Sequence, residues 1–213
     1  MFPPRRSLLP FVLVCLVLPG AAGCGREAIS ETGSEGRFYT ADDLPDLVLH
    51  RDEAPEGTEF LKDRSGRRDL ERFWPSSCCV GVQVQFEEAG FQTAHVALFE
   101  RPGHSADPVD TRPGWELVTS SAVLFMTDEG AAEAMDMWID HHRAPVLDPV
   151  DVRGLGKHAV GLAGSPTSPA EQQYLYFWRR GRLLLALRAS TGAGTVSVEQ
   201  VHRLVDRMDA RAS

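Results

Sequence analysis

The sequence predicts one α+β domain in which a mainly antiparallel sheet packs with helices, the arrangement of an α/β sandwich. Two observations lead to this fold class. Apolar segments rich in Val, Leu, Phe and Thr occur in pairs, and each pair is followed by a segment with apolar residues at helical spacing. This order occurs once within residues 91–143 and again within residues 173–210. The 213 residues are enough for one such domain even without the N-terminal segment.

Residues 1–23 have the three parts of a secretory signal. They begin with the basic pair Arg5 and Arg6, continue with an apolar run over residues 8–18, and end in small residues ahead of Cys24. The apolar run is shorter than the ~20 residues that a helix needs to cross a bilayer, so a permanent transmembrane helix is not expected. The arginine pair leaves the export route open between a twin-arginine signal and the general secretory route.

The stretch Ala21-Ala22-Gly23-Cys24 resembles the lipobox of bacterial lipoproteins. The resemblance implies cleavage ahead of Cys24, acylation of the Cys24 thiol, and a lipid-anchored place on the extracytoplasmic face of the cell membrane. Each buried methylene of an acyl chain contributes ~0.8 kcal/mol, so two or three chains form a lasting anchor. The alternative is an ordinary secretory signal with a chance cysteine near its cleavage site.

The chain is acidic, with a net charge of −8. Removal of residues 1–23 takes away two arginines and no acid, which changes the net charge to −10. An acidic surface argues against nucleic-acid binding and against a polybasic attachment to anionic lipid. The expected partners are therefore the lipid bilayer, through acylated Cys24, and an envelope protein or small ligand.

Residues 24–57 are predicted to be a flexible spacer because they are polar, acidic and glycine-rich, with one short apolar patch at 44–49. The globular domain is expected over residues 58–213. Both charge signs are dense over residues 51–72, where short helical fragments are expected.

The segment after Pro75 predicts a helix that ends at Gly90. Alternating apolar residues over 82–86 leave a strand as the alternative. The apolar side chains at helical spacing are Cys79, Val82, Phe86 and Ala89.

Residues 91–99 and 115–126 are predicted to be strands that pair as a hairpin with a long loop. Thr127 then caps a helix whose first turn is acidic, as the positive end of the helix dipole favours, and Pro145 ends that helix.

A glycine turn at 154–156 leads into a short predicted strand over residues 159–162. Two long apolar strands follow at 173–178 and 183–189, joined by a tight turn at 180–181. The last predicted helix begins with a capping box formed by the side chains of Ser197 and Gln200. Its apolar stripe consists of Val201, Leu204, Val205 and Met208.

This order of elements resembles the PsbP-like α/β/α sandwich. Two turns are also similar to those of secreted actinobacterial lipoproteins. The resemblance covers roughly residues 75–212 and implies an accessory or binding subunit. The two turns are Gly154-Leu155-Gly156-Lys157-His158-Ala159 and Trp178-Arg179-Arg180-Gly181-Arg182-Leu183.

Of the four cysteines, Cys15 leaves with the signal and Cys24 is the expected acylation site, so the neighbours Cys78 and Cys79 remain. Neighbouring Cα atoms lie ~3.8 Å apart, below the usual disulfide range of ~4.4–6.8 Å. Two free, half-buried thiols are therefore expected, and a vicinal redox switch is the alternative.

The densest group of ligand-type side chains is His141 and His142 with Asp136 and Asp140. A metal site needs three or four convergent ligands, and this helix supplies two at most, so no metal is predicted. No nucleophile elbow is present around a serine. The sequence therefore predicts no catalytic residue and no cofactor.

The loop over residues 101–114 has the length of a functional loop, although a solvated connection is the alternative. Tryptophans beside it or in the hairpin are candidates for a ligand platform, with a role in the core as the alternative. The ligand-binding candidates are Trp115, Trp178, His104, Asp107 and Asp110.

The function predicted first is a membrane-anchored, extracytoplasmic lipoprotein that acts as a non-catalytic binding or accessory module in the cell envelope. One alternative is an envelope hydrolase or thiol-dependent enzyme that uses Cys78 or Cys79. Another is a structural or assembly factor, which would lack an enclosed pocket of ~300 Å³ or more.

Overall fold

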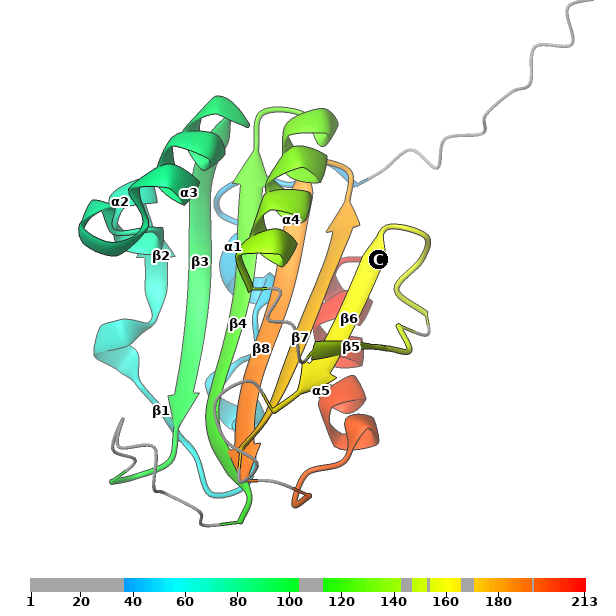
Figure 1. Ribbon diagram of the computed structural model, residues 1–213. Coiled ribbons are helices and arrows are strands. Elements are labelled where there is room, and N and C mark those ends of the chain that lie inside the picture. The colour runs from blue at the N-terminus through cyan, green and yellow to red at the C-terminus, as the bar shows by residue number, and fades with distance from the viewer. Residues whose placement is uncertain (1–36, 104–112, 143–146, 153, 166–170, 193) are drawn as a thin grey trace, which may run out of the picture. The chain divides into compact units, whose positions relative to one another are not determined.

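The computed structural model describes residues 37–213 except 104–112, 143–146, 153, 166–170 and 193. In the described residues, an eight-stranded sheet carries helices on both faces (Figure 1). The strand order is β1-β3-β4-β8-β7-β6-β5, β2 also pairs with β3, and all of these pairings are antiparallel. The predicted α+β fold class is confirmed. The strands are β1 (Glu59–Phe60), β2 (Gly66–Arg68), β3 (Phe91–Glu100), β4 (Trp115–Phe125), β5 (Leu147–Val150), β6 (Ala159–Gly164), β7 (Glu171–Arg180) and β8 (Leu183–Gly192), and the helices are α1 (Leu44–Leu47), η1 (Arg51–Glu53), η2 (Lys62–Arg64), α2 (Leu70–Phe73), α3 (Ser76–Glu88), α4 (Asp128–His142) and α5 (Val198–Arg211).

The long strands β3, β4, β7 and β8 lie where the sequence predicts strands, and their side chains alternate between two cores. In β8, Leu183 and Leu185 face one core, whereas Leu184 and Ala186 face the other. Successive residues of a strand point to opposite faces. Because both faces are covered, β8 is apolar at almost every position over its first half, as expected for a strand buried on both sides.

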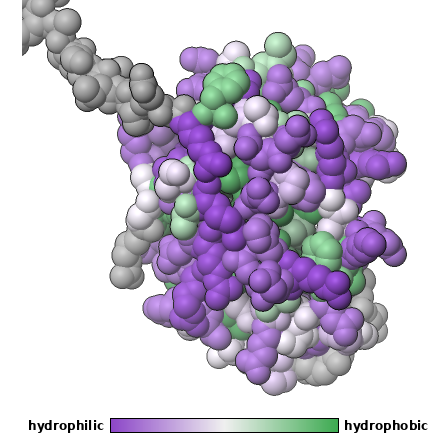
Figure 2. Space-filling view, turned by 180° about the vertical axis from the view of Figure 1, so that it is seen from behind, coloured by the Kyte–Doolittle hydropathy of each residue, from purple (hydrophilic) through white to green (hydrophobic). Residues whose placement is uncertain are grey.

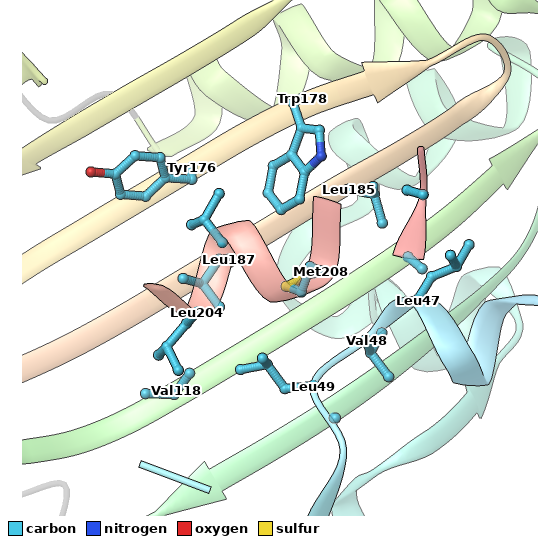
Figure 3. Packing of buried hydrophobic residues seen from close by; sticks show 14 of the residues in the cluster. Leu47, Val48, Leu49, Val118, Tyr176, Trp178, Leu185, Leu187, Leu204 and Met208 are labelled. Atoms are coloured by element: carbon cyan, nitrogen blue, oxygen red, sulfur yellow. The ribbon is translucent and has the colours of Figure 1, made fainter. Parts of the chain in front are cut away.

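The first core lies between the sheet and helices α1 and α5 (Figure 3). Leu204 and Met208 of α5 face Leu185 and Leu187 of β8 there, close to Trp178 of β7. The predicted stripe of α5 is therefore confirmed as buried. Seen from this side, the outer surface of the protein is mainly hydrophilic (Figure 2).

Helix α5 begins at the predicted capping box. The Gln200 backbone N–H donates to Ser197 Oγ at 3.3 Å, and the Ser197 backbone N–H donates to Gln200 Oε1 at 2.8 Å. These bonds satisfy two backbone donors that a helix N-terminus otherwise leaves without partners.

The second core lies on the opposite face, between the sheet and helices α2, α3 and α4. Phe86 of α3 and Phe125 of β4 are fully buried there, with their ring centroids 5.8 Å apart. Residues 76–88 are helical, so the predicted helix is confirmed and the strand alternative is wrong.

Helix α4 starts where its cap was expected. The Gly130 backbone N–H donates to Thr127 Oγ1 at 3.0 Å. Gly130 also lies against the end of α3, because a Cβ at this position would stand 1.9 Å from the carbonyl oxygen of Ala89. A glycine therefore allows α4 to approach the preceding helix closely.

The segment before residue 58 differs from the prediction. Leu44, Leu47 and Leu49 are each 1% exposed and belong to the first core. The Tyr39 hydroxyl donates a hydrogen bond to the Ala212 carbonyl oxygen at 2.5 Å. The expected spacer over residues 24–57 is therefore wrong for residues 37–57, which are part of the folded domain, because the apolar patch buries its side chains under α5.

Short edge strands also differ from expectation. The charged segment 51–72 contains the expected helical fragments, but it also forms β1 and β2. Strand β5 lies between Pro145 and the glycine turn at 154–156, where no strand was predicted, and it contains Pro149. Proline is tolerated there because β5 is the last strand in the sheet order, where a backbone N–H is not needed for a further neighbour.

The predicted secretory signal and the acylation site Cys24 lie outside the described residues. In the part of the chain that the structure does describe, no helix combines the length and apolar character needed to span a bilayer.

Candidate functional site

A cavity of about 260 Å³ lies beneath the helices of the second core. Helices α2, α3 and α4 cover only one end of strands β3, β4 and β8 (Figure 1), and the lining of the cavity combines residues of α2 and α4 with residues of the sheet. The lining residues are Arg68, Arg72, Phe73, Trp74, Val96, Thr119, Ser121, Trp138, His142, Leu175, Phe177, Ala186, Leu187 and Arg188.

The sheet forms the floor of the cavity. In β4, the residues on this face change from apolar Phe125 and Val123 to polar Ser121 and Thr119. In β8 they change in the same direction, ending at Arg188, which lies directly opposite Thr119 in the antiparallel register. Because side chains opposite each other on one face are neighbours, the polar ends of the two strands meet below the cavity.

Aromatic side chains form the walls. Trp74 follows α2, and Trp138 lies on α4, with their ring centroids 5.9 Å apart in an edge-on arrangement. One turn along α4, the His142 ring stacks on Phe177 of β7 at 6.4 Å with an interplanar angle of 19°. The Trp74 indole N–H is buried and has no acceptor among the described residues. A flat apolar group therefore finds rings on several sides here.

The charged groups around the cavity are cationic. Its described lining includes Arg68, Arg72 and Arg188 and no carboxylate. Arg68 donates to the Arg64 carbonyl oxygen. The guanidinium groups of Arg72 and Arg188 form no hydrogen bond or ion pair with the residues that the structure describes. In a chain of net charge −8, this is a local excess of positive charge.

The histidine of the cavity is neutral at neutral pH. Burial, together with the smaller effect of the positive charges of Arg188 and His141, lowers the pKa of His142 to about 4. His142 thus contributes a hydrogen-bonding ring, and the arginines contribute the charge.

No activated nucleophile is present in the described lining. Neither Thr119 nor Ser121 is hydrogen-bonded to His142 in the structure, and a serine or threonine hydroxyl is a weak nucleophile without an adjacent base. The arrangement is suited to holding a ligand through ring contacts, hydroxyls and guanidinium groups.

The structure places the predicted ligand-binding residues elsewhere or leaves them outside its described part. Trp178 is 0% exposed and lies inside the first core. Trp115 lies at a second hollow of about 460 Å³, where Glu53 and Glu56 stand with Arg203 and Arg207. His104, Asp107 and Asp110 lie outside the described residues.

The tryptophans that line the cavity are instead Trp74 and Trp138. The sequence signal that could have found this site is the polar end of an otherwise apolar strand face, at Thr119 and Ser121. The predicted cluster around His141 gives no metal site, since no group of three or more His, Cys, Asp or Glu side chains converges among the described residues.

Cys78 and Cys79 are free thiols in the structure, but only Cys79 is half-buried as predicted. Cys78 is exposed, and its Sγ donates to the Pro75 carbonyl oxygen at 3.3 Å. A hydrogen bond with Cys78, together with burial and the charge of Cys78, raises the pKa of the Cys79 thiol above its ordinary value. A raised pKa disfavours the thiolate, which is the nucleophilic form.

Comparison with known proteins gives a likeness of fold. No protein-family model matches the chain, and no curated protein gives a significant match. Among solved structures, the chain is similar to the extracellular domain of PknH from Mycobacterium tuberculosis, with a TM-score of 0.50 and 12% sequence identity over 82% of this chain and 96% of that chain. At this identity the likeness establishes a shared fold. The PsbP-like subclass stays a prediction.

Proposed function

We propose that this chain is an extracytoplasmic, lipid-anchored protein whose folded domain binds a small organic ligand without catalysing a reaction. The observation that carries the binding role is the cavity between Trp74, Trp138 and the polar end of the sheet face. Its volume of about 260 Å³ lies just below the ~300–1,000 Å³ of pockets for drug-sized ligands, which favours a ligand of fragment size.

The proposed location has independent support from the first residues of the chain. Residues 1–23 have the pattern of a secretory signal, and Ala21-Ala22-Gly23-Cys24 resembles a lipobox. The shared fold with the extracellular domain of PknH is consistent with the same side of a membrane.

The anchor is tested by mass spectrometry of the amino-terminal peptide. The chain is expressed in a bacterium that processes lipoproteins, and the membrane fraction is digested. The expected result is a peptide that begins at Cys24 and carries acyl chains, with Cys24→Ala protein absent from the membrane fraction. An unmodified Cys24 in the mature protein would contradict the anchor.

The binding role is tested by a thermal-shift screen of small organic compounds against three forms of the full chain. Thr119→Trp fills the cavity from its floor at a strand position that favours aromatic residues. Thr119→Val keeps the shape and removes only the hydroxyl. We expect compounds that raise the Tm of the wild type and of Thr119→Val but not of folded Thr119→Trp. Equal shifts in all three forms would reject the cavity as the binding site.

The thiol-dependent alternative has weaker support. The raised pKa of Cys79 opposes a reactive thiolate at neutral pH. Neither cysteine lines the cavity.

A further inference from the structure

We infer that the ligand of the cavity is a small organic carboxylate whose apolar part is a flat ring. This inference rests on the proposed binding function and specifies its chemistry. It follows from three features of the described residues, namely the arginines, the aromatic walls and the polar floor.

The arginines reach the cavity from different elements. Arg68 lies in β2, Arg72 in α2 and Arg188 in β8. Arginine presents a planar fork of N–H donors that matches a carboxylate, and it keeps its charge at any physiological pH. Because the Arg72 and Arg188 guanidinium groups have no acid partner among the described residues, an incoming anion would not have to displace one.

The acids near these arginines are already engaged. Glu71 accepts hydrogen bonds from the side chains of Ser76 and Gln83 at 3.0 and 2.7 Å. The Asp69 carboxylate caps α2 by accepting the Arg72 backbone N–H at 2.8 Å. Arginines therefore line the cavity, whereas the nearby carboxylates of Asp69 and Glu71 are hydrogen-bonded to the backbone and to neutral side chains.

The walls select against a bare inorganic anion. Phe73, Trp74, Trp138 and Phe177 present ring surfaces to the cavity, and burying apolar area against them contributes ~25 cal/mol per Å². Phosphate or sulfate would leave this surface unused. A ring carried by the carboxylate would use both halves of the site, with the hydroxyls of Thr119 and Ser121 as further donors.

The inference is tested by isothermal titration calorimetry of the full chain with a matched series. The probes are 3-phenylpropionate, its neutral amide 3-phenylpropanamide, the cation 3-phenylpropylamine, and inorganic phosphate. We expect the carboxylate to bind about tenfold or more tightly than the amide, the scale of a hydrogen bond to a charged group. The amine and phosphate should bind more weakly still. Added salt should lower the binding affinity of the carboxylate, because Arg72 and Arg188 are exposed and their charges are screened.

Three variants test whether the arginines of the cavity cause the preference for the carboxylate. Arg188→Gln and Arg72→Gln keep a polar side chain without the charge, and each should lower carboxylate affinity about five- to twentyfold while leaving amide affinity unchanged. Arg51→Gln is the matched control, because Arg51 is an exposed arginine of η1 that does not line the cavity. It should bind the carboxylate like the wild type.

Failure of this inference is distinguishable from failure of the proposed function. Equal affinity for the carboxylate and the amide, no loss in either cavity variant, or no carboxylate binding at millimolar concentration would overturn the carboxylate assignment. Neutral or cationic compounds that bind the wild type and are lost in Thr119→Trp would overturn the assignment and keep the binding function. The binding function itself fails only if the screen yields no compound that depends on the cavity.

Discussion

Arg211 joins the last helix to the first folded segment through Glu53. Its Nη1 donates to both carboxylate oxygens of Glu53 at 2.9 and 3.0 Å, and its Nη2 donates to the Val48 carbonyl oxygen at 2.8 Å. The two side chains are 24% and 18% exposed, so water screens the pair only in part. The contact closes the first core at the end of α5.

We predict that Arg211→Gln lowers the free energy of unfolding by about 1–3 kcal/mol, because it leaves a partly buried carboxylate and a backbone carbonyl without their donor. Burial alone would raise the pKa of Glu53, but hydrogen bonds from Arg211 and from the His50 backbone outweigh it and hold this pKa below its ordinary value. A lowered pKa means that the stabilisation is present above the unfolded-state pKa and is lost as the pH falls through the folded-state value. Urea unfolding at neutral and acidic pH measures both effects. A variant as stable as the wild type at neutral pH would contradict the role of this pair.

Leu47 tests whether residues 37–57 belong to the domain. It is 1% exposed in the first core, whereas its neighbour Asp46 is exposed. Leu47→Ala should cost about 2–4 kcal/mol of unfolding free energy through lost burial and the cavity left behind. Asp46→Ala, the adjacent control, should change it by less than about 0.5 kcal/mol. If both substitutions change the unfolding free energy measured by chemical denaturation equally and only slightly, residues 37–57 are a spacer and not part of the domain.

Gly130 and Gly81 form a matched pair of helical glycines. A Cβ at position 130 would stand 1.9 Å from the Ala89 carbonyl oxygen, whereas a Cβ at position 81 meets nothing within 4 Å. Glycine to alanine normally stabilises an exposed helix by up to ~1 kcal/mol, so Gly81→Ala should raise the Tm. Gly130→Ala should lower it, because α4 must move away from the end of α3. Differential scanning calorimetry of both variants compares the signs, and a rise in both would show that the close approach is not needed.

The helices and strands that were predicted correctly are those set by local sequence signals. The capping box at Ser197 and the helical stripe ending at Met208 predict α5 because caps and spacing act within a few residues. The long apolar strands β7 and β8 are predicted for the same reason. The role of residues 37–57 was missed because composition averaged over 24–57 is polar, although the short patch at 44–49 supplies a buried surface.

The cavity was missed for a different reason. Trp74 and Trp138 are far apart in the chain and meet only through the packing of α2 and α4. No spacing rule within one element could join them. The candidates Trp115 and Trp178 were chosen for their place beside a long loop or in a hairpin, a criterion that does not tell which face of the sheet a side chain occupies.

His142 gives the last prediction, a pH dependence of stability. Its ring lies against Phe177 and Trp74, and Arg188 and His141 are the cationic groups that act on it. The folded-state pKa of about 4 lies below the unfolded-state value, which is ~6.5. Protonation therefore favours the unfolded chain, so this contribution is complete above the unfolded-state pKa and is lost as the pH falls toward the folded-state value.

Allowing for partial solvent screening, we expect the wild type to lose about 1 kcal/mol more stability than His142→Gln between about pH 7 and pH 5. His141→Gln is the control, because His141 is the exposed neighbour on the same helix and should leave most of the wild-type pH slope in place. Urea unfolding at a series of pH values measures the three slopes. If the slope of His142→Gln is parallel to that of the wild type, the pKa of His142 is not lowered by folding, and the ring would then add positive charge to the cavity only at mildly acidic pH.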